Sequence, residues 1–174
     1  PQRDKSSHKG ENGKVLVVGG NEIFHGAPIL ASLGAERMGA DLVFICVPSV
    51  HAPVARHYSL NFIVHEFLER YLTPSYTAVI KKLSKTTDVL VLGNGLGPKE
   101  ETHQAVVDIL EQVSIPVVLD ADALFPEILT VKAKSPWIIT PHSAEFERVF
   151  NLPATRENIA DRAQKFQITI LKKG

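Results

Sequence analysis

The sequence has 174 residues, of which 44% are hydrophobic and 22% charged, so one globular domain can bury a core. Nineteen Lys and Arg residues balance nineteen Asp and Glu residues, which argues against nucleic acid or a membrane surface as the main partner. Cys46 is the only cysteine, which excludes a disulfide framework and a cysteine-based zinc site and fits a reducing compartment such as the cytoplasm. No apolar run reaches the roughly 18 residues that a membrane span needs.

Two parts of the chain differ in composition. Residues 1–12 are polar, and we expect them to form a loose N-terminal arm. Residues 13–174 carry regular apolar patterns and are expected to form one α/β domain. The first residue, Pro1, is not a methionine, which we interpret as the start of a processed or excised piece.

Short apolar runs recur along residues 13–174. They are rich in β-branched residues and lack polar alternation, which is typical of parallel strands covered on both faces. The predicted strands are Val15–Val18, Leu42–Val47, Val89–Leu92, Ile115–Leu119, Trp137–Ile139 and Ile168–Leu171, and Phe62–Val64 could be a further strand.

Segments with helical spacing of apolar residues separate these runs. Residues 27–40 differ from the others, because their many Ala and Gly residues would let a helix lie very close to a sheet. The alternation of strand and helix predicts right-handed crossovers and a three-layer α/β/α sandwich with a mainly parallel sheet. The helical positions are Tyr76, Val79, Ile80 and Leu83; Val106, Ile109, Leu110 and Val113; and Ile159, Ala163 and Phe166.

Glycines follow two of the predicted strands. After the first come Gly19-Gly20 and then Gly26-Ala27-Pro28, a kind of turn that is common whether or not it binds a ligand. After Val89–Leu92 comes Gly93-Asn94-Gly95-Leu96-Gly97-Pro98, which is neither a Walker loop nor a full dinucleotide fingerprint. Three glycines in five residues leave amide groups that can face a phosphate or a flat ring, so we favour a ligand role over a structural turn.

Acidic residues follow the next predicted strand. Asp120 and Asp122 come directly after Leu119 and could hold a cation or accept ribose hydroxyls. Asp122 could equally cap a following helix. Asp120 is therefore the better functional candidate of the two.

A histidine and a glutamate follow Trp137–Ile139. Thr140 or Ser143 can cap the next helix, and Glu145 in its first turn suits the helix dipole. His142 stands at a strand end, where open parallel sheets bind ligands, although a lone histidine in a chain with seven is more often structural.

Taken in this order, the motifs resemble the ADP-dependent NAD(P)H-hydrate dehydratases of the ribokinase-like superfamily. The resemblance covers nearly the whole chain, and the ordered set is specific although no single motif decides it. It is carried by His8-Lys9-Gly10, Gly13, Gly19-Gly20, Gly26-Ala27-Pro28, Gly93-x-Gly95-Leu96-Gly97, Leu119-Asp120-Ala121-Asp122-Ala123-Leu124, Thr140-Pro141-His142-x-x-Glu145-Phe146 and Leu171-Lys172-Lys173-Gly174.

The sequence departs from the family pattern in three respects. Asn94 stands where proline is common, and Ser143-Ala144 replaces a frequent Pro-Gly. The family continues past the position of Gly174 into a nucleotide-binding segment and a Gly-x-Gly-Asp turn that supplies an anion hole and the catalytic aspartate. We therefore interpret the chain as the N-terminal two-thirds of a ribokinase-like domain, and expect it to be inactive, to expose an apolar edge and to form a homo-oligomer.

The resemblance implies a lyase of metabolite repair, which uses ADP or ATP to dehydrate (S)-NADHX and (S)-NADPHX to NADH and NADPH in the cytoplasm. It also implies Mg²⁺ and allows a monovalent cation. By the same resemblance, Ala27, Gly95, Gly97 and His142 hold the hydrated dinucleotide; Asp120, Asp122 and Glu145 lie near the phosphates, with Glu145 as a metal ligand; and Lys173 and Gly174 begin the adenine-nucleotide segment.

Two rival interpretations remain open. The first is another ribokinase-like kinase that acts on a small alcohol, of the hydroxyethylthiazole or hydroxymethylpyrimidine type. The second is a nucleotide-binding domain that keeps the fold without catalysis. The ordered Gly-Ala-Pro and Thr-Pro-His-x-x-Glu motifs favour the dehydratase over the kinase.

Overall fold

The computed structural model describes residues 6, 8 and 10–174. Most of the predicted arm, residues 1–5, 7 and 9, lies outside the described residues. The backbone N–H groups of Gly10 and Asn12 donate to the Asp41 carboxylate, at 2.9 and 3.0 Å. The last part of the predicted arm is therefore attached to the domain.

In the described residues, seven parallel strands form one sheet in the order β3-β2-β1-β4-β5-β6-β7. Every predicted strand is confirmed, including the further one that begins at Phe62. The strand predicted from Ile115 begins two residues later, after Pro116, which has no N–H to donate. The strands are β1 (Lys14–Val18), β2 (Leu42–Pro48), β3 (Phe62–Phe67), β4 (Val89–Leu92), β5 (Val117–Leu119), β6 (Trp137–Ile139) and β7 (Thr169–Ile170).

Helices connect successive strands, except for β5 and β6, which are joined by short 3₁₀ turns. The predicted helical segments are confirmed, whereas α2 was not predicted, because seven residues with Pro53 in the first turn are too few to show a periodic pattern. The helices are α1 (Gly26–Arg37), α2 (Ala52–Tyr58), α3 (Thr77–Ser84), α4 (Glu100–Gln112), α5 (Ser143–Phe150) and α6 (Arg156–Phe166), with short 3₁₀ turns that include η3 (Ala121–Ala123) and η4 (Pro126–Thr130).

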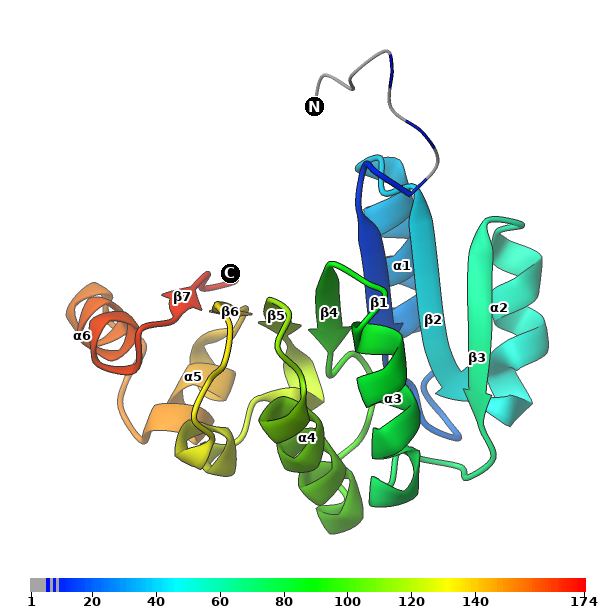
Figure 1. The fold of residues 1–174 in the computed structure, drawn as a ribbon. Helices are drawn as coiled ribbons and strands as arrows, with labels where there is room; N and C mark the ends of the chain where they lie inside the picture. Colours follow the sequence, from blue (N-terminus) through cyan, green and yellow to red (C-terminus); the bar gives the residue numbers. More distant parts are fainter. Residues whose placement is uncertain (1–5, 7, 9) are drawn as a thin grey trace.

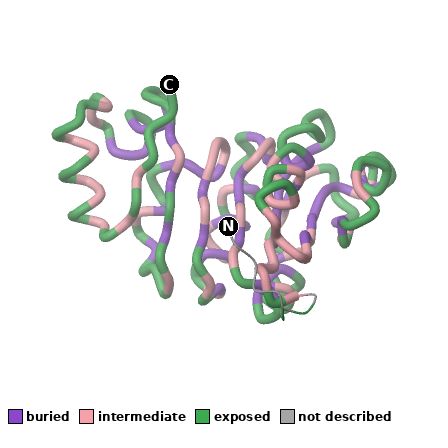
Figure 2. The backbone as a smooth tube through the Cα atoms, turned by 90° about the horizontal axis from the view of Figure 1, so that it is seen from above, coloured by how far each residue is buried: buried purple, intermediate pink, exposed green. Residues whose placement is uncertain are grey.

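Two apolar clusters on opposite faces of the sheet confirm the three-layer sandwich (Figure 1). On one face, strand residues such as Leu90 and Leu119 pack with α3, α4 and α5. On the other face, Val17 and Ile45 pack with α1 and α2. Figure 2 shows the buried strands between more exposed helices, and α6 at one end has no buried residue.

The second face is covered only over half of the sheet. Helices α1 and α2 contact β1, β2 and β3. Beyond β1, Val91 and Val118 are only half-buried, Ile138 is 39% exposed, and Leu171 after β7 is 61% exposed. The expected exposed apolar surface is present, on this bare face as well as next to the edge strand.

The small residues of α1 predicted a close approach to the sheet, and the first turn shows one, since a Cβ added at Gly19 would lie 3.0 Å from the Cβ of Pro28. Ala31 and Ala35 pack against the apolar cluster on this face of the sheet. Gly34 is exposed, and a Cβ added there would meet no atom outside its own helix within 4 Å. Among the helices in the described part of the chain, none is long and apolar enough to cross a bilayer.

Candidate functional site

The loops after β1 and β4 abut at the carboxyl ends of the strands. The N–H of Gly20 donates to the backbone oxygen of Asn94 at 2.9 Å. A Cβ added at Gly95 would lie 3.6 Å from the Cβ of Ala27, the first-turn residue of α1. The structure therefore brings Ala27 and the glycine loop together, as the sequence predicted.

The backbone geometry explains each glycine of the loop after β4. Gly93, Gly95 and Gly97 all have positive φ, at 125°, 74° and 84°. A Cβ at Gly93 would lie 1.9 Å from the backbone oxygen of Asp120, and one at Gly97 would lie 2.7 Å from the Nδ2 of Asn21. Because only glycine fits these positions without strain, the number of glycines does not by itself indicate a ligand.

Asp122 holds the glycine loop in place. Its Oδ2 accepts a hydrogen bond from the N–H of Gly97 at 2.9 Å. The alternative that Asp122 caps a following helix is wrong, because the residue lies inside the short turn η3 and no α-helix begins there. The two carboxylates after β5 therefore differ: Asp122 holds the glycine loop, and Asp120 lies more centrally among the strand ends.

That central carboxylate is Asp120, and three side chains from three other segments contact it. The Nδ2 of Asn94 donates to Oδ2 at 2.9 Å, and the hydroxyl of Thr140 donates to Oδ1 at 2.7 Å. The Lys173 ammonium also contacts Oδ1. Asp120 therefore joins the carboxyl ends of β4, β5, β6 and β7.

His142 caps α5, which corrects the prediction that Thr140 or Ser143 does so. The N–H of Glu145 donates to His142 Nδ1 at 3.1 Å, and the N–H of His142 donates to Glu145 Oε2 at 2.8 Å. Thr140 is engaged with Asp120 instead. This capping box fixes the ring of His142 at the strand ends and orients the carboxylate of Glu145, which is buried.

Lys173 connects the two carboxylates. Its ammonium lies against Asp120 and 3.7 Å from Glu145 Oε2, while its backbone N–H donates to Pro141 at 2.9 Å. The predicted site residues, apart from Gly174, are thus linked through neighbouring contacts at the carboxyl ends of the strands. The backbone oxygen of Gly174 accepts a hydrogen bond from the Lys172 ammonium, outside this network.

Sequence reasoning missed Thr140 as a site side chain, and it also missed Arg148. The guanidinium of Arg148 donates to the backbone oxygens of Leu124 and Ala121, at 2.8 and 3.0 Å. Ala121 has φ of +51°, an unfavourable conformation for a residue other than glycine. Arg148 therefore supports the strained turn next to Asp120, and no short motif marks such a contact in the sequence.

A wide depression of about 510 Å³ opens beside these strand ends. Its polar side comes from Asn94, Asp120, Thr140 and Lys173, and its apolar side comes from α1 and the bare face of the sheet. A phosphorylated ligand with a flat ring needs both kinds of surface. In the described residues, no group of three His, Cys, Asp or Glu side chains is arranged to hold a metal ion without help from a ligand.

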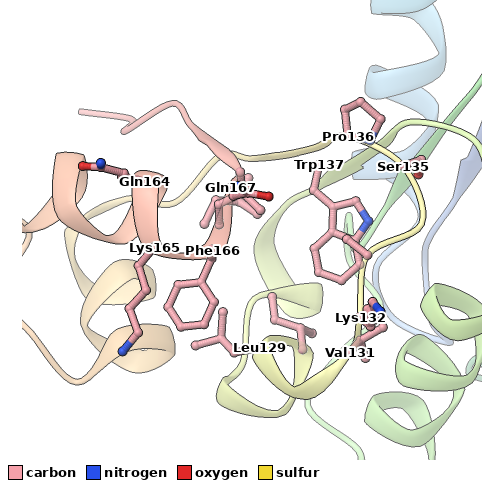
Figure 3. Close-up of a pocket in the computed structure, with 14 residues that line it drawn as sticks. Leu129, Val131, Lys132, Ser135, Pro136, Trp137, Gln164, Lys165, Phe166 and Gln167 are labelled. Atoms are coloured by element: carbon pink, nitrogen blue, oxygen red, sulfur yellow. The ribbon is translucent and has the colours of Figure 1, made fainter.

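A larger cavity of about 630 Å³ lies at the other end of the strands, before β6 and β7 (Figure 3). Trp137, Phe166 and Val131 line it together with the lysines Lys132 and Lys165. No carboxylate or histidine lines this cavity. We therefore place the candidate site at the carboxyl ends, where the titratable groups meet.

Comparison with known proteins agrees with this arrangement. The family profile described as NAD(P)H-hydrate dehydratase matches residues 15–174, nearly the whole chain. The chain belongs to the NAD(P)H-hydrate dehydratase family. Within that family, it is 38% identical over 183 residues to the ADP-dependent (S)-NAD(P)H-hydrate dehydratase of Nitrosopumilus maritimus, with 100% of this chain and 63% of that protein covered.

Solved structures of NAD(P)H-hydrate dehydratases share the fold. The ADP/ATP-dependent enzyme from Bacillus subtilis, crystallised with ATP and Mg²⁺, is 30% identical, with a TM-score of 0.82 over 100% of this chain and 62% of that one. A ribokinase-like superfamily protein from Enterococcus faecalis has a TM-score of 0.81 at 22% identity over 99% of this chain and 61% of that one, and shows the fold alone. The chain spans about 63% of the length of the first curated relatives it matches.

Proposed function

We propose that this protein takes part in ADP- or ATP-dependent dehydration of (S)-NADHX and (S)-NADPHX to NADH and NADPH. The observation that carries the proposal is the convergence of Asp120, Glu145 and Lys173 beside the glycine loop and His142. Family membership supplies the reaction class, and the relatives' names supply the substrates and the phosphoryl donor.

The reaction needs a better leaving group than hydroxide. Transfer of a phosphoryl group to the oxygen on C6 of the hydrated ring, followed by loss of phosphate, restores the double bond. Such transfer depends on positioning and on neutralising phosphate charge. In this proposal, Ala27, Gly95, Gly97 and His142 position the dinucleotide at the strand ends.

The carboxylates fit a phosphate-bound metal. Mg²⁺ is usually held by one or two carboxylates together with substrate phosphates, and it would neutralise phosphate charge when bound. Asp120 and Glu145 both direct an oxygen at the Lys173 ammonium, so a cationic group already lies between them. Glu145 would be the Mg²⁺ ligand, with Asp120 next to it. Asp122 would lie near the phosphates from its place beside the glycine loop. The proposal also allows a monovalent cation.

The 174 residues alone are expected to turn over slowly or not at all. By the family resemblance, the base that removes the hydroxyl proton and the anion hole follow the position of Gly174. Losing a general base and an oxyanion site together lowers rates by about four orders of magnitude or more. Binding and turnover therefore need separate assays.

The test has two arms. Thermal-shift titration of the 174-residue chain with (S)-NADPHX is expected to raise its melting temperature, and hydroxyethylthiazole is expected not to. Recovery of NADH from (S)-NADHX, followed by absorbance, is expected only when the sequence is extended to the relatives' full length. Stabilisation by the thiazole alcohol alone would favour a small-alcohol kinase, and light scattering would report the predicted homo-oligomer.

A further inference from the structure

Asn94 ties together the ends of three strands. Its backbone oxygen accepts from the N–H of Gly20, in the loop after β1. Its side-chain Nδ2 donates to Oδ2 of Asp120, at the end of β5. Asn94 itself follows β4, so a single residue connects the turn that opens α1, the glycine loop and the central carboxylate.

The other half of this carboxamide makes no hydrogen bond. Asn94 Oδ1 is buried and has no partner among the described residues. Rotating the amide by half a turn would place this oxygen against the Asp120 carboxylate, which like-signed partial charges disfavour. A buried carbonyl without a partner destabilises the fold, so the orientation is set by Asp120 at the expense of stability.

Asp120 uses its two oxygens differently. Oδ1 contacts Thr140 and Lys173, whereas Oδ2 is bonded by Asn94. Two donors on opposite oxygens fix the plane of the carboxylate. Asn94 and Asp120 both line the depression at the strand ends. The contact thus orients a group that faces the ligand space.

We propose that Asn94 is a positioning residue for ligand binding, which acts by orienting the carboxylate of Asp120. This inference rests on the proposed function, because Asp120 matters only if a ligand occupies the depression. Asn94 stands where the family commonly has proline, which has no side-chain donor for Asp120. This chain therefore orients Asp120 by its own means.

Asn94→Leu tests the proposal, because leucine has nearly the same shape without the amide. It removes the bond to Asp120 and also the unpartnered carbonyl. The melting temperature is expected to stay unchanged or to rise, while affinity for (S)-NADPHX falls about tenfold, as for a lost bond to a charged group. Asn158→Leu, at the start of α6, is the matched control and is expected to bind as the unaltered chain does.

A double-mutant cycle separates positioning from a structural role. If Asn94 acts through Asp120, Asn94→Leu changes affinity much less when Asp120 is already alanine, measured by NMR titration up to millimolar ligand. Equal effects in both backgrounds, unchanged affinity in the single variant, or a lower melting temperature would each overturn the proposal. If the unaltered chain does not bind (S)-NADPHX, the proposed function itself fails, and this inference fails with it.

Discussion

The two ends of the sheet differ in what they offer a ligand. At the amino ends, the larger cavity is lined mainly by aromatic and aliphatic side chains, together with Lys132 and Lys165. At the carboxyl ends, the smaller depression is lined by Asp120, Thr140 and Lys173, which follow different strands. The larger cavity volume therefore does not identify the functional site. The parallel topology of the sheet identifies it, because this topology brings the loops of successive strands to one edge.

The largest expected effect lies at the amino ends and concerns stability. Trp137 is 5% exposed, and Trp137→Ala should lower the free energy of unfolding by about 3–5 kcal/mol through the cavity it leaves. Chemical denaturation measures this loss. The variant should still bind (S)-NADPHX under conditions where it is folded. Loss of binding by the folded variant would show that the amino ends of the strands also take part in ligand binding.

The next effect lies at the carboxyl ends and concerns binding. Asp120→Ala should weaken (S)-NADPHX binding about 100-fold, since the Lys173 ammonium loses its closest carboxylate. Calorimetric titration measures the affinity. Glu127, exposed on η4 at the far end, gives a matched control in Glu127→Ala. Equal affinities for the two variants would argue against the site.

A smaller expected effect is on stability, and it differs between glycines according to their surroundings. Gly34→Ala in α1 should raise stability by roughly 0.5–1 kcal/mol, because the new methyl group meets no atom outside its own helix within 4 Å and alanine favours the helix. Gly93→Ala should instead destabilise the protein, because its Cβ would overlap the backbone of Asp120. Thermal unfolding of the two variants shows whether the strand-end glycines are structural.

The smallest expected effect on stability at neutral pH concerns Cys46 in β2. Burial raises the pKa of the Cys46 thiol to about 12, although a hydrogen bond with Tyr76 opposes this shift. The folded state therefore favours the neutral thiol, and this contribution to stability is full below the ordinary pKa of about 9 and is lost as pH rises toward 12. Thiol reagents at pH near 8 should label Cys46 only after denaturation. Rapid labelling of folded protein would contradict its burial.

Much of the fold follows from the sequence, because buried parallel strands read as continuous apolar runs. The seven strands and the larger helices were predictable in this way. The helix α2 was not, because it is short. The site was predictable as a set of strand ends but not as a set of contacts. The sequence does not show that Asn94 bonds Asp120, that Asp122 holds Gly97 or that His142 caps α5. Each contact depends on the three-dimensional conformation of the loops involved.

The central claim is that loops at the carboxyl ends form one cleft for a phosphorylated nucleotide. Amide NMR spectra of the 174-residue chain, titrated with (S)-NADPHX, test it residue by residue. The account predicts that the largest shift changes fall at Gly95, Asp120 and His142. Changes confined to Trp137 and Phe166 at the opposite end of the sheet, or no changes at all, would contradict it.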